Sequence, residues 1–149
     1  MSIIGFNFEK ISVERKKVPQ GEIKISNNVR LTDVREEKIN VGEAHKALKV
    51  GFEYKLEYGS DIGNLMLTGN VIYLDDKKKQ DSIIEAWNAK KPLDTKFSLS
   101  ITNTVLAKCN IKAIELCSEV NLPTHIAMPV AKPKGAKTAK ESKESSYIG

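Results

Sequence analysis

The sequence of 149 residues predicts an α+β fold, a four-stranded antiparallel sheet backed by a long C-terminal helix. Two observations predict it. Segments with the two-residue alternation of strands come first and segments with helical spacing come last, and the strands are joined by turns rather than by helices. We expect one α+β domain over residues 1–130, followed by a flexible lysine-rich tail over residues 131–149.

Two strands are expected in the N-terminal third. The first covers residues 4–13 and is expected to be bent or bulged near residue 9, where the alternation of its apolar residues is interrupted. Those residues are Ile4, Phe6, Phe8, Ile11 and Val13. Residues 22–31 alternate again, and the pair Asn27–Asn28 favours a turn or bulge within them.

A hairpin is expected in the middle of the chain. Residues 36–45 are charged and contain a glycine, which indicates a loop before it. Residues 46–58 carry an apolar side chain at every second position from Leu48 to Tyr58, with charged residues and Gly51 between them, so one face of this strand should be buried and the other wet. After a turn at residues 59–63, residues 64–74 are apolar at nearly every position, as expected of a central strand covered on both faces. Gly69 suggests a bend or a close backbone approach there.

Two helices should follow. Residues 80–89 predict a short amphipathic helix capped by Asp81. Residues 95–120 predict a long one that is capped by Asp94 and stopped by Pro123. Its apolar surface is wider than one stripe and is interrupted by polar residues, so we expect a helix–helix interface between subunits there. The residues that mark this interface are Asn103, Asn110 and Lys112.

Motifs of catalysis are absent from the sequence. It has no glycine-rich phosphate loop, no cysteine pair at metal spacing and no nucleophile signature, so we expect no enzyme, no cofactor and no metal. His45 lies at the entrance of a strand and His125 in a loop with prolines, and because neither has an evident carboxylate partner we interpret them as exposed or hydrogen-bonded histidines rather than as ligands or bases. Glu53 and Glu57 share a strand face with lysines, which favours a solvated mixed-charge surface over a carboxylate pair.

The cellular location is expected to be the cytoplasm. No apolar run is long enough to span a membrane, and the N-terminus lacks the pattern of a signal peptide. Cys109 and Cys117 lie eight residues apart on the long helix, too far to bridge, so we interpret them as small apolar residues in a reducing compartment.

The end of the long helix resembles a known family. Residues 122–130, LPTHIAMPV, resemble the helix-connecting loop of the SecB export-chaperone family, with its two prolines and final Pro-Val at the same spacing. Residues 10–14, KISVE, look like that family's Asp-Ile-Ser-aromatic-Glu in strand one. The order of elements over residues 4–130 is also similar: bent strand, charged crossover, alternating strand, hairpin, apolar strand, short helix, long helix.

The resemblance implies an ATP-independent holdase that keeps unfolded or nascent polypeptides in apolar grooves, with a role in protein export. It also implies a homodimer or homotetramer, in which the long helices lie between two sheets. The expected polypeptide-binding residues are large apolar side chains near loops, and we expect Trp87 to lie near the 122–130 loop. They are Trp87, Phe97, Leu122, Ile126 and Met128, and the alternative interpretation is that these side chains close the core over the helix ends.

The sequence departs from that family at three places. Lys10 stands where the family usually has an acid, and Leu67 and Thr68 stand where strand three would supply another. Docking to the export ATPase is therefore not expected. The family's second, apolar helix after the loop is replaced by the lysine-rich tail, which removes one wall of the implied groove.

The tail supports a rival function, a ribosome- or RNA-associated accessory protein. The tail carries +3 of the net charge of +5, because five lysines face two glutamates there, while the body is nearly neutral. In many ribosomal proteins such tails hold rRNA phosphates through charge and counterion release, whereas many other proteins end in lysine-rich tails that have no partner. The residues expected to contact RNA in that case are Lys132, Lys134, Lys137 and Lys140.

Overall fold

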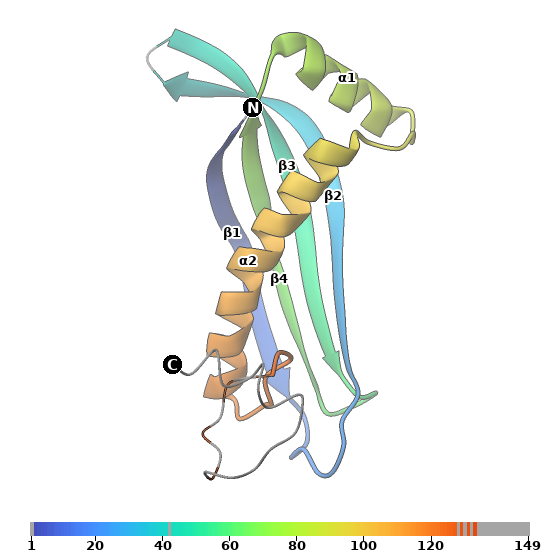
Figure 1. The fold of residues 1–149 in the computed structure, drawn as a ribbon, viewed down its shortest axis with the longest axis vertical. Helices are drawn as coiled ribbons and strands as arrows, with labels where there is room; N and C mark the ends of the chain where they lie inside the picture. Colours follow the sequence, from blue (N-terminus) through green and yellow to red (C-terminus); the bar gives the residue numbers. More distant parts are fainter. Residues whose placement is uncertain (1, 42, 128, 130, 132, 134–149) are drawn as a thin grey trace.

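The computed structural model describes residues 2–41, 43–127, 129, 131 and 133. Its four strands form one antiparallel sheet in the order β1-β4-β3-β2, and α2 runs along one face of it (Figure 1). The predicted α+β class and the four-stranded antiparallel sheet are therefore confirmed. The elements are β1 (Ser2–Arg15), β2 (Ile25–Val41), β3 (Glu43–Tyr58), β4 (Gly63–Leu74), α1 (Lys77–Asn88) and α2 (Thr95–Glu119).

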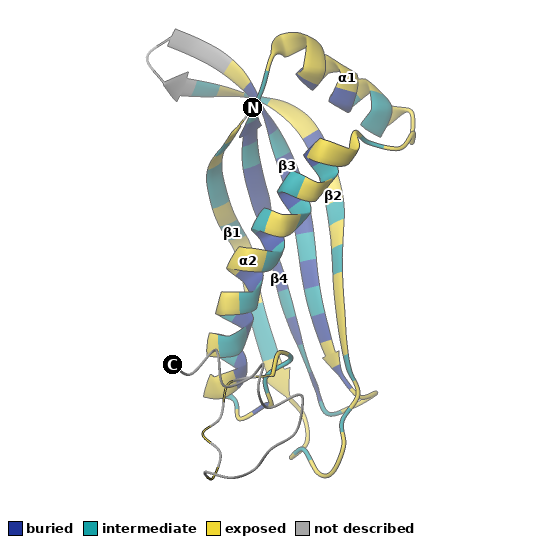
Figure 2. Cartoon of the chain, viewed as in Figure 1, coloured by how far each residue is buried: buried dark blue, intermediate teal, exposed yellow. Residues whose placement is uncertain are grey.

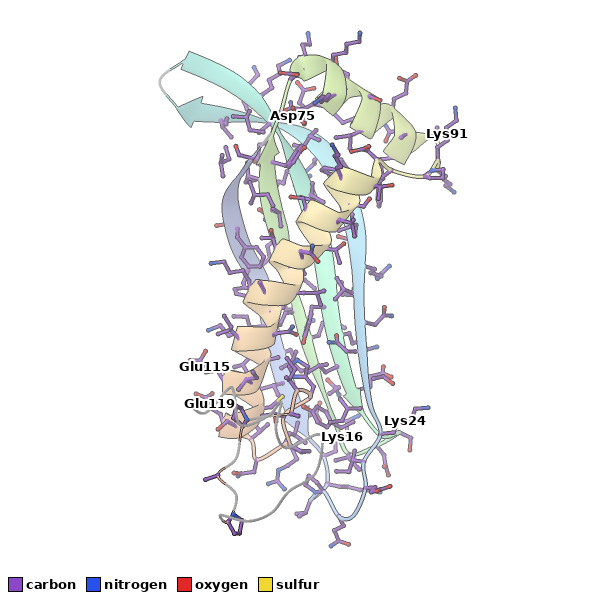
Figure 3. The ribbon with its side chains drawn as sticks, in the orientation of Figure 1. Lys16, Lys24, Asp75, Lys91, Glu115 and Glu119 are labelled. Carbon is purple, nitrogen blue, oxygen red and sulfur yellow. The ribbon has the colours of Figure 1, made fainter. Side chains whose placement is uncertain are left out.

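The first strand lies at one edge and is bulged where the sequence predicts it. Its pairing with β4 shifts by one residue between Phe8 and Lys10, so Glu9 is the extra residue. The connection to β2 then crosses the end of the sheet, where Lys16 and Lys24 lie (Figure 3). Lys16 N donates to Ile62 O at 2.8 Å, which ties this connection to the turn between β3 and β4.

The second strand differs from its prediction in two ways. Asn27 and Asn28 pair regularly with β3, and the bulge lies at Thr32 instead. The segment predicted as a loop, residues 36–45, is a hairpin, in which β2 continues to Val41 and β3 begins at Glu43. Its strands are joined by the antiparallel backbone pairing that continues from the rest of β2 and β3, and the charged atoms of Glu36 and Lys46 are 3.0 Å apart across it. Because most residues of this segment are charged or polar, its sequence does not show the apolar alternation of a half-buried strand.

The hydrophobic core lies between the sheet and α2. Every second residue of β3 from Leu48 to Tyr58 is at most 1 % exposed, as the strict alternation predicts. The buried residues of α2 recur every fourth position, which makes one ridge along the helix (Figure 2). They are Phe97, Ile101, Val105, Cys109, Ala113 and Cys117.

The ridge changes in size along the helix. Its first half is Phe97, Ile101 and Val105, whereas the second half is small, since it consists of two cysteines and an alanine. The small residues lie where β3 presents large rings, as shown by Tyr58, whose Oη is 3.1 Å from Cys117 Sγ. Small residues on the helix thus leave room for tyrosine on the sheet.

No helix among the described residues covers the opposite face of the sheet. The central strand β4 alternates between buried and half-buried residues, so the prediction that both its faces are covered is wrong for a single chain. The uncovered face carries Arg30–Glu53 and Lys55–Glu57 ion pairs at 3.0 and 2.9 Å. It is the mixed-charge surface that the sequence predicts for Glu53 and Glu57.

The short helix begins earlier than predicted. It starts at Lys77 with Asp76 at the N-cap position, whereas the prediction covered residues 80–89 and assigned the cap to Asp81. The reason is the buried side chain of Gln80, whose Oε1 accepts from Asp75 N at 2.9 Å and whose Nε2 donates to Lys46 O at 3.0 Å. These bonds fix the first turn against β3, a tertiary contact with no sequence signal.

The long helix starts as predicted, because Asp94 Oδ2 accepts from Phe97 N at 3.2 Å. Its end is set before Pro123. Asn121 takes a left-handed conformation with φ of 59°, and Leu122 N donates to Cys117 O at 2.9 Å. This Schellman turn closes the helix and directs Leu122 back into the core.

Candidate functional site

Two of the predicted polypeptide-binding residues are buried in the core. Phe97 is 1 % exposed and packs edge-on against Tyr73, with ring centroids 4.9 Å apart. Leu122 is 4 % exposed and lies over Gly63, where a side chain would come within 3.2 Å of its methyl groups. The expectation that these two side chains form a surface site is therefore wrong for this subunit.

The other predicted residues lie at opposite ends of α2. Trp87 is half-buried near the end of α1, beside a cavity of about 520 Å³ that it lines with Asn88, Lys90, Lys91 and Leu93. Ile126 follows α2 and is 39 % exposed. The 25 residues of α2 span about 37 Å, so the expectation that Trp87 lies near the 122–130 loop is wrong. Met128 lies outside the described residues.

The outer side of α2 is apolar and without charge over a long stretch. Because the buried ridge repeats every four residues, the row offset by two positions points away from the sheet, and every member of it is exposed. In this row Leu99 is 56 % and Ile111 is 70 % exposed, and Asn103 lies between them. No residue from Ser98 to Ala107 is charged. A surface helix usually carries charges on its outer face, so this face has the composition of a contact surface.

Only one of the three predicted interface residues lies in this outer row. Asn103 does, whereas Asn110 is used inside the subunit, where its Oδ1 accepts from Tyr54 Oη at 2.7 Å. Lys112 is half-buried on the flank of α2 and pairs with Glu115 of the same helix at 3.3 Å. Exposed Leu99 and Ile111 were missed because apolar residues in a helix are first assigned to the core. The four-residue repeat of the ridge was the signal that could have distinguished Leu99 and Ile111 from the buried residues of α2.

The segment after α2 is held by a polar cluster that the sequence did not predict. His125 Nε2 lies 3.0 Å from Tyr54 Oη and 3.0 Å from Asn110 Oδ1. Tyr58 Oη donates to Pro123 O at 2.7 Å. Burial lowers the pKa of His125 from its usual value. The interpretation of His125 as a hydrogen-bonded histidine in a loop is confirmed, and its partners lie on β3 and α2; the side chain of His45 is outside the described residues.

Both cysteines are buried and unbridged, as predicted. Burial raises the pKa of Cys109 to about 12, so its thiol stays protonated at neutral pH. The described residues contain no group of three or more side chains that could hold a metal ion. Neither described helix combines the length and apolar character needed to cross a membrane. The tail lysines Lys132, Lys134, Lys137 and Lys140 lie outside the described residues.

Comparison with known proteins leaves the function open. No protein family matches the chain, and neither does any curated protein or any solved structure.

Proposed function

We propose that this chain is the subunit of a cytoplasmic, ATP-independent holdase that assembles through α2 and binds unfolded polypeptides. The observation that carries the proposal is the outer row of α2, since Leu99 and Ile111 are more than half exposed and no charge lies between Ser98 and Ala107. A solitary subunit would leave this surface in water. Covering it with another subunit removes apolar area from water at about 25 cal/mol per Å².

The order of elements supports the same proposal. A bulged first strand, a hairpin that ends in a central strand, a short helix and a long helix are the elements that the SecB resemblance implies, and they follow in that order. The helix lies on one face of the sheet only, so a second copy placed on α2 would give helices between two sheets (Figure 1). This is the arrangement that the resemblance implies for its dimer of dimers.

The proposed client surface lies at the two ends of α2. Trp87 and Leu93 supply half-buried apolar side chains at one end, and Ile126 supplies an exposed one at the other. The helix between them is about 37 Å long, and an extended chain rises about 3.3 Å per residue. A client segment of about 11 extended residues would therefore reach both ends. A client that must be extended to bind fits a holdase for unfolded chains.

The test is suppression of aggregation of a chemically unfolded model protein. We expect equimolar subunits to slow aggregation, and Trp87→Ala and Ile126→Asp to weaken this effect while the circular dichroism spectrum is unchanged. Truncating an aromatic side chain at a binding hot spot costs about 2 kcal/mol, or roughly thirtyfold in affinity. Binding of the client should also change the fluorescence of Trp87, the single tryptophan.

The control variant is Val18→Asp, which changes an apolar residue that is 67 % exposed but lies in the connection between β1 and β2. It should suppress aggregation as well as the wild-type protein does. Wild-type protein that neither slows aggregation nor shows a fluorescence change would reject the holdase. Binding to RNA that weakens steeply with added salt would instead favour the accessory protein anchored by its tail.

A further inference from the structure

The segment after α2, Pro123–Ala127, is held to the sheet by two side chains of β3. Tyr58 Oη donates to Pro123 O at 2.7 Å, and Tyr54 Oη is 3.0 Å from His125 Nε2. We call this segment the strap. Since Tyr54 and Tyr58 lie on the buried face of β3, the strap closes the core beside the end of α2.

The hydrogen bonds around His125 assign its tautomer. Tyr54 Oη donates to Asn110 Oδ1 at 2.7 Å, so the lone pairs of this hydroxyl remain to accept. Asn27 Nδ2 donates to it at 3.4 Å, and His125 Nε2 is the second nitrogen within reach at 3.0 Å. Nε2 is also 3.0 Å from Asn110 Oδ1, an acceptor only. Both contacts of Nε2 are hydrogen bonds when Nε2 carries the proton, so the proton of the neutral ring is on Nε2 and not on Nδ1.

The other ring nitrogen decides what acid does to the strap. Nδ1 of His125 is buried and has no hydrogen-bond partner among the described residues. In the neutral ring it is an unpaired acceptor, but protonation makes it a charged donor with nothing to bond. Leaving a buried charged donor unpaired is far more costly than leaving an acceptor unpaired.

The surroundings offer the imidazolium no compensation. The ring faces Tyr54 from β3 and Asn110 from α2, and Asn27 from β2 contacts Tyr54. Cys109 and Cys117 of α2 are the further titratable groups that act on Tyr54, and burial keeps both thiols protonated. Tyr54 is also neutral at pH 7, since burial raises its pKa. No described carboxylate forms an ion pair with His125 (the described pairs all involve lysine or arginine).

We propose that the strap is an acid-released latch: protonation of His125 detaches Pro123–Ala127 from Tyr54 and uncovers the inner face of β3. Proton linkage gives the direction in which pH changes the stability of the closed strap. Burial lowers the pKa of His125 in the closed state, whereas the detached ring has the ordinary pKa near 6.5. The open state therefore binds more protons, and the closed state loses stability as the pH falls through 6.5. At pH 5.5 opening is favoured by up to about tenfold over pH 7.5.

Release has a consequence for client binding, and this step rests on the proposed function. The strap follows Leu122, which is buried over Gly63, and contains Ile126, which is exposed. Detaching it would add the rings of Tyr54 and Tyr58 to the apolar surface at this end of α2. A holdase with this latch should bind clients more tightly at pH 5.5 than at pH 7.5.

Hydrogen exchange of the full chain at pH 7.5 and pH 5.5 tests the latch, with rates corrected for intrinsic exchange. We expect the amide of Leu122, which donates to Cys117 O at 2.9 Å where the strap begins, to lose protection by up to about tenfold at the lower pH. His125→Gln is the matched variant, because its side-chain amide can still donate to Tyr54 but does not titrate, and it should keep the Leu122 amide protected at both pH values. Tyr54→Phe removes the shared acceptor and should leave the Leu122 amide less protected at pH 7.5.

An NMR titration of the two histidines completes the test, with His45→Gln to assign the resonances. His125 should titrate below 6.5. Protection of the Leu122 amide that is equal at both pH values, or an acid effect that persists in His125→Gln, would overturn the latch. If the strap opens but aggregation is suppressed equally at both pH values, the latch stands and the proposed client site fails.

Discussion

Gly69 of β4 pairs with Phe8 of β1, next to the bulge at Glu9. A Cβ atom at this position would be 2.0 Å from the carbonyl oxygen of Asn7 and 2.9 Å from Cζ of Phe52. Phe52 stacks on Phe6 with ring centroids 5.1 Å apart, so neither the backbone nor the ring can move away easily. The close approach predicted from a glycine in an apolar strand is confirmed.

We expect Gly69→Ala to lower the free energy of unfolding by about 3 kcal/mol, because the new methyl group meets backbone atoms that cannot rotate away. Urea denaturation measures it. Gly51→Ala is the control, since its Cβ would meet the side-chain hydroxyl of Thr32 at 2.5 Å, and this exposed side chain can turn. A cost at Gly51 as large as at Gly69 would contradict this interpretation.

At the scale of the element, α2 has two different sides. The ridge from Phe97 to Cys117 binds it to its own sheet through contacts that are fully buried. The row with Leu99 and Ile111 points away from the sheet, and Glu115 and Glu119 continue it toward the end of the helix (Figure 3). The apolar part of the outer side is thus confined to the first two thirds of the helix, which places the proposed subunit contact there.

Replacing Leu99 or Ile111 with Glu should break the assembly, because a carboxylate at the centre of an apolar contact loses its hydration without gaining a partner. Sedimentation velocity at tens of micromolar measures it, and both variants should sediment as smaller species than the wild-type protein. Glu119→Lys changes a charge on the same row and should leave the size unchanged. A wild-type protein that is already a monomer at this concentration would remove the proposed interface.

At the scale of the whole molecule, the described core is closed by the end of α2 and the strap. Leu122 packs over Gly63 at the start of β4, and Tyr58 bonds to Pro123. Residues 131–149 contain no large apolar side chain before Tyr147. The fold should therefore not need them.

Deleting residues 131–149 should leave the melting temperature nearly unchanged, as followed by circular dichroism at fixed protein concentration. Deleting residues 122–149 is the contrasting variant. It removes a buried leucine, which costs about 3 kcal/mol, or roughly 10 °C for a chain of this size. A fall of many degrees for the shorter deletion would show that the tail docks through Tyr147 and Ile148.

The sequence by itself determined the class of the fold, the central hairpin, the bulge at Glu9 and the N-cap and length of α2. These features are local, because alternation, helical spacing and an N-cap are set by residues close together in the chain. The hairpin at residues 36–45 was not predicted, because the segment is rich in charged residues and contains Gly42, a composition that favours a loop. The start of α1 was not predicted either, because the side chain of Gln80 is fixed by a hydrogen bond to Lys46 of β3, which is far away in the sequence.

Only the tertiary structure decided which side chains of the candidate site are available. Phe97 and Leu122 look like surface anchors in the sequence and are core residues, while Leu99 and Ile111 look like core residues and are exposed. The latch at His125 depends on Tyr54, a residue 71 positions away in the chain. Burial and pairing of this kind are properties of how the elements pack. A periodic pattern shows that a helix has faces, but only the packing decides which face meets the sheet.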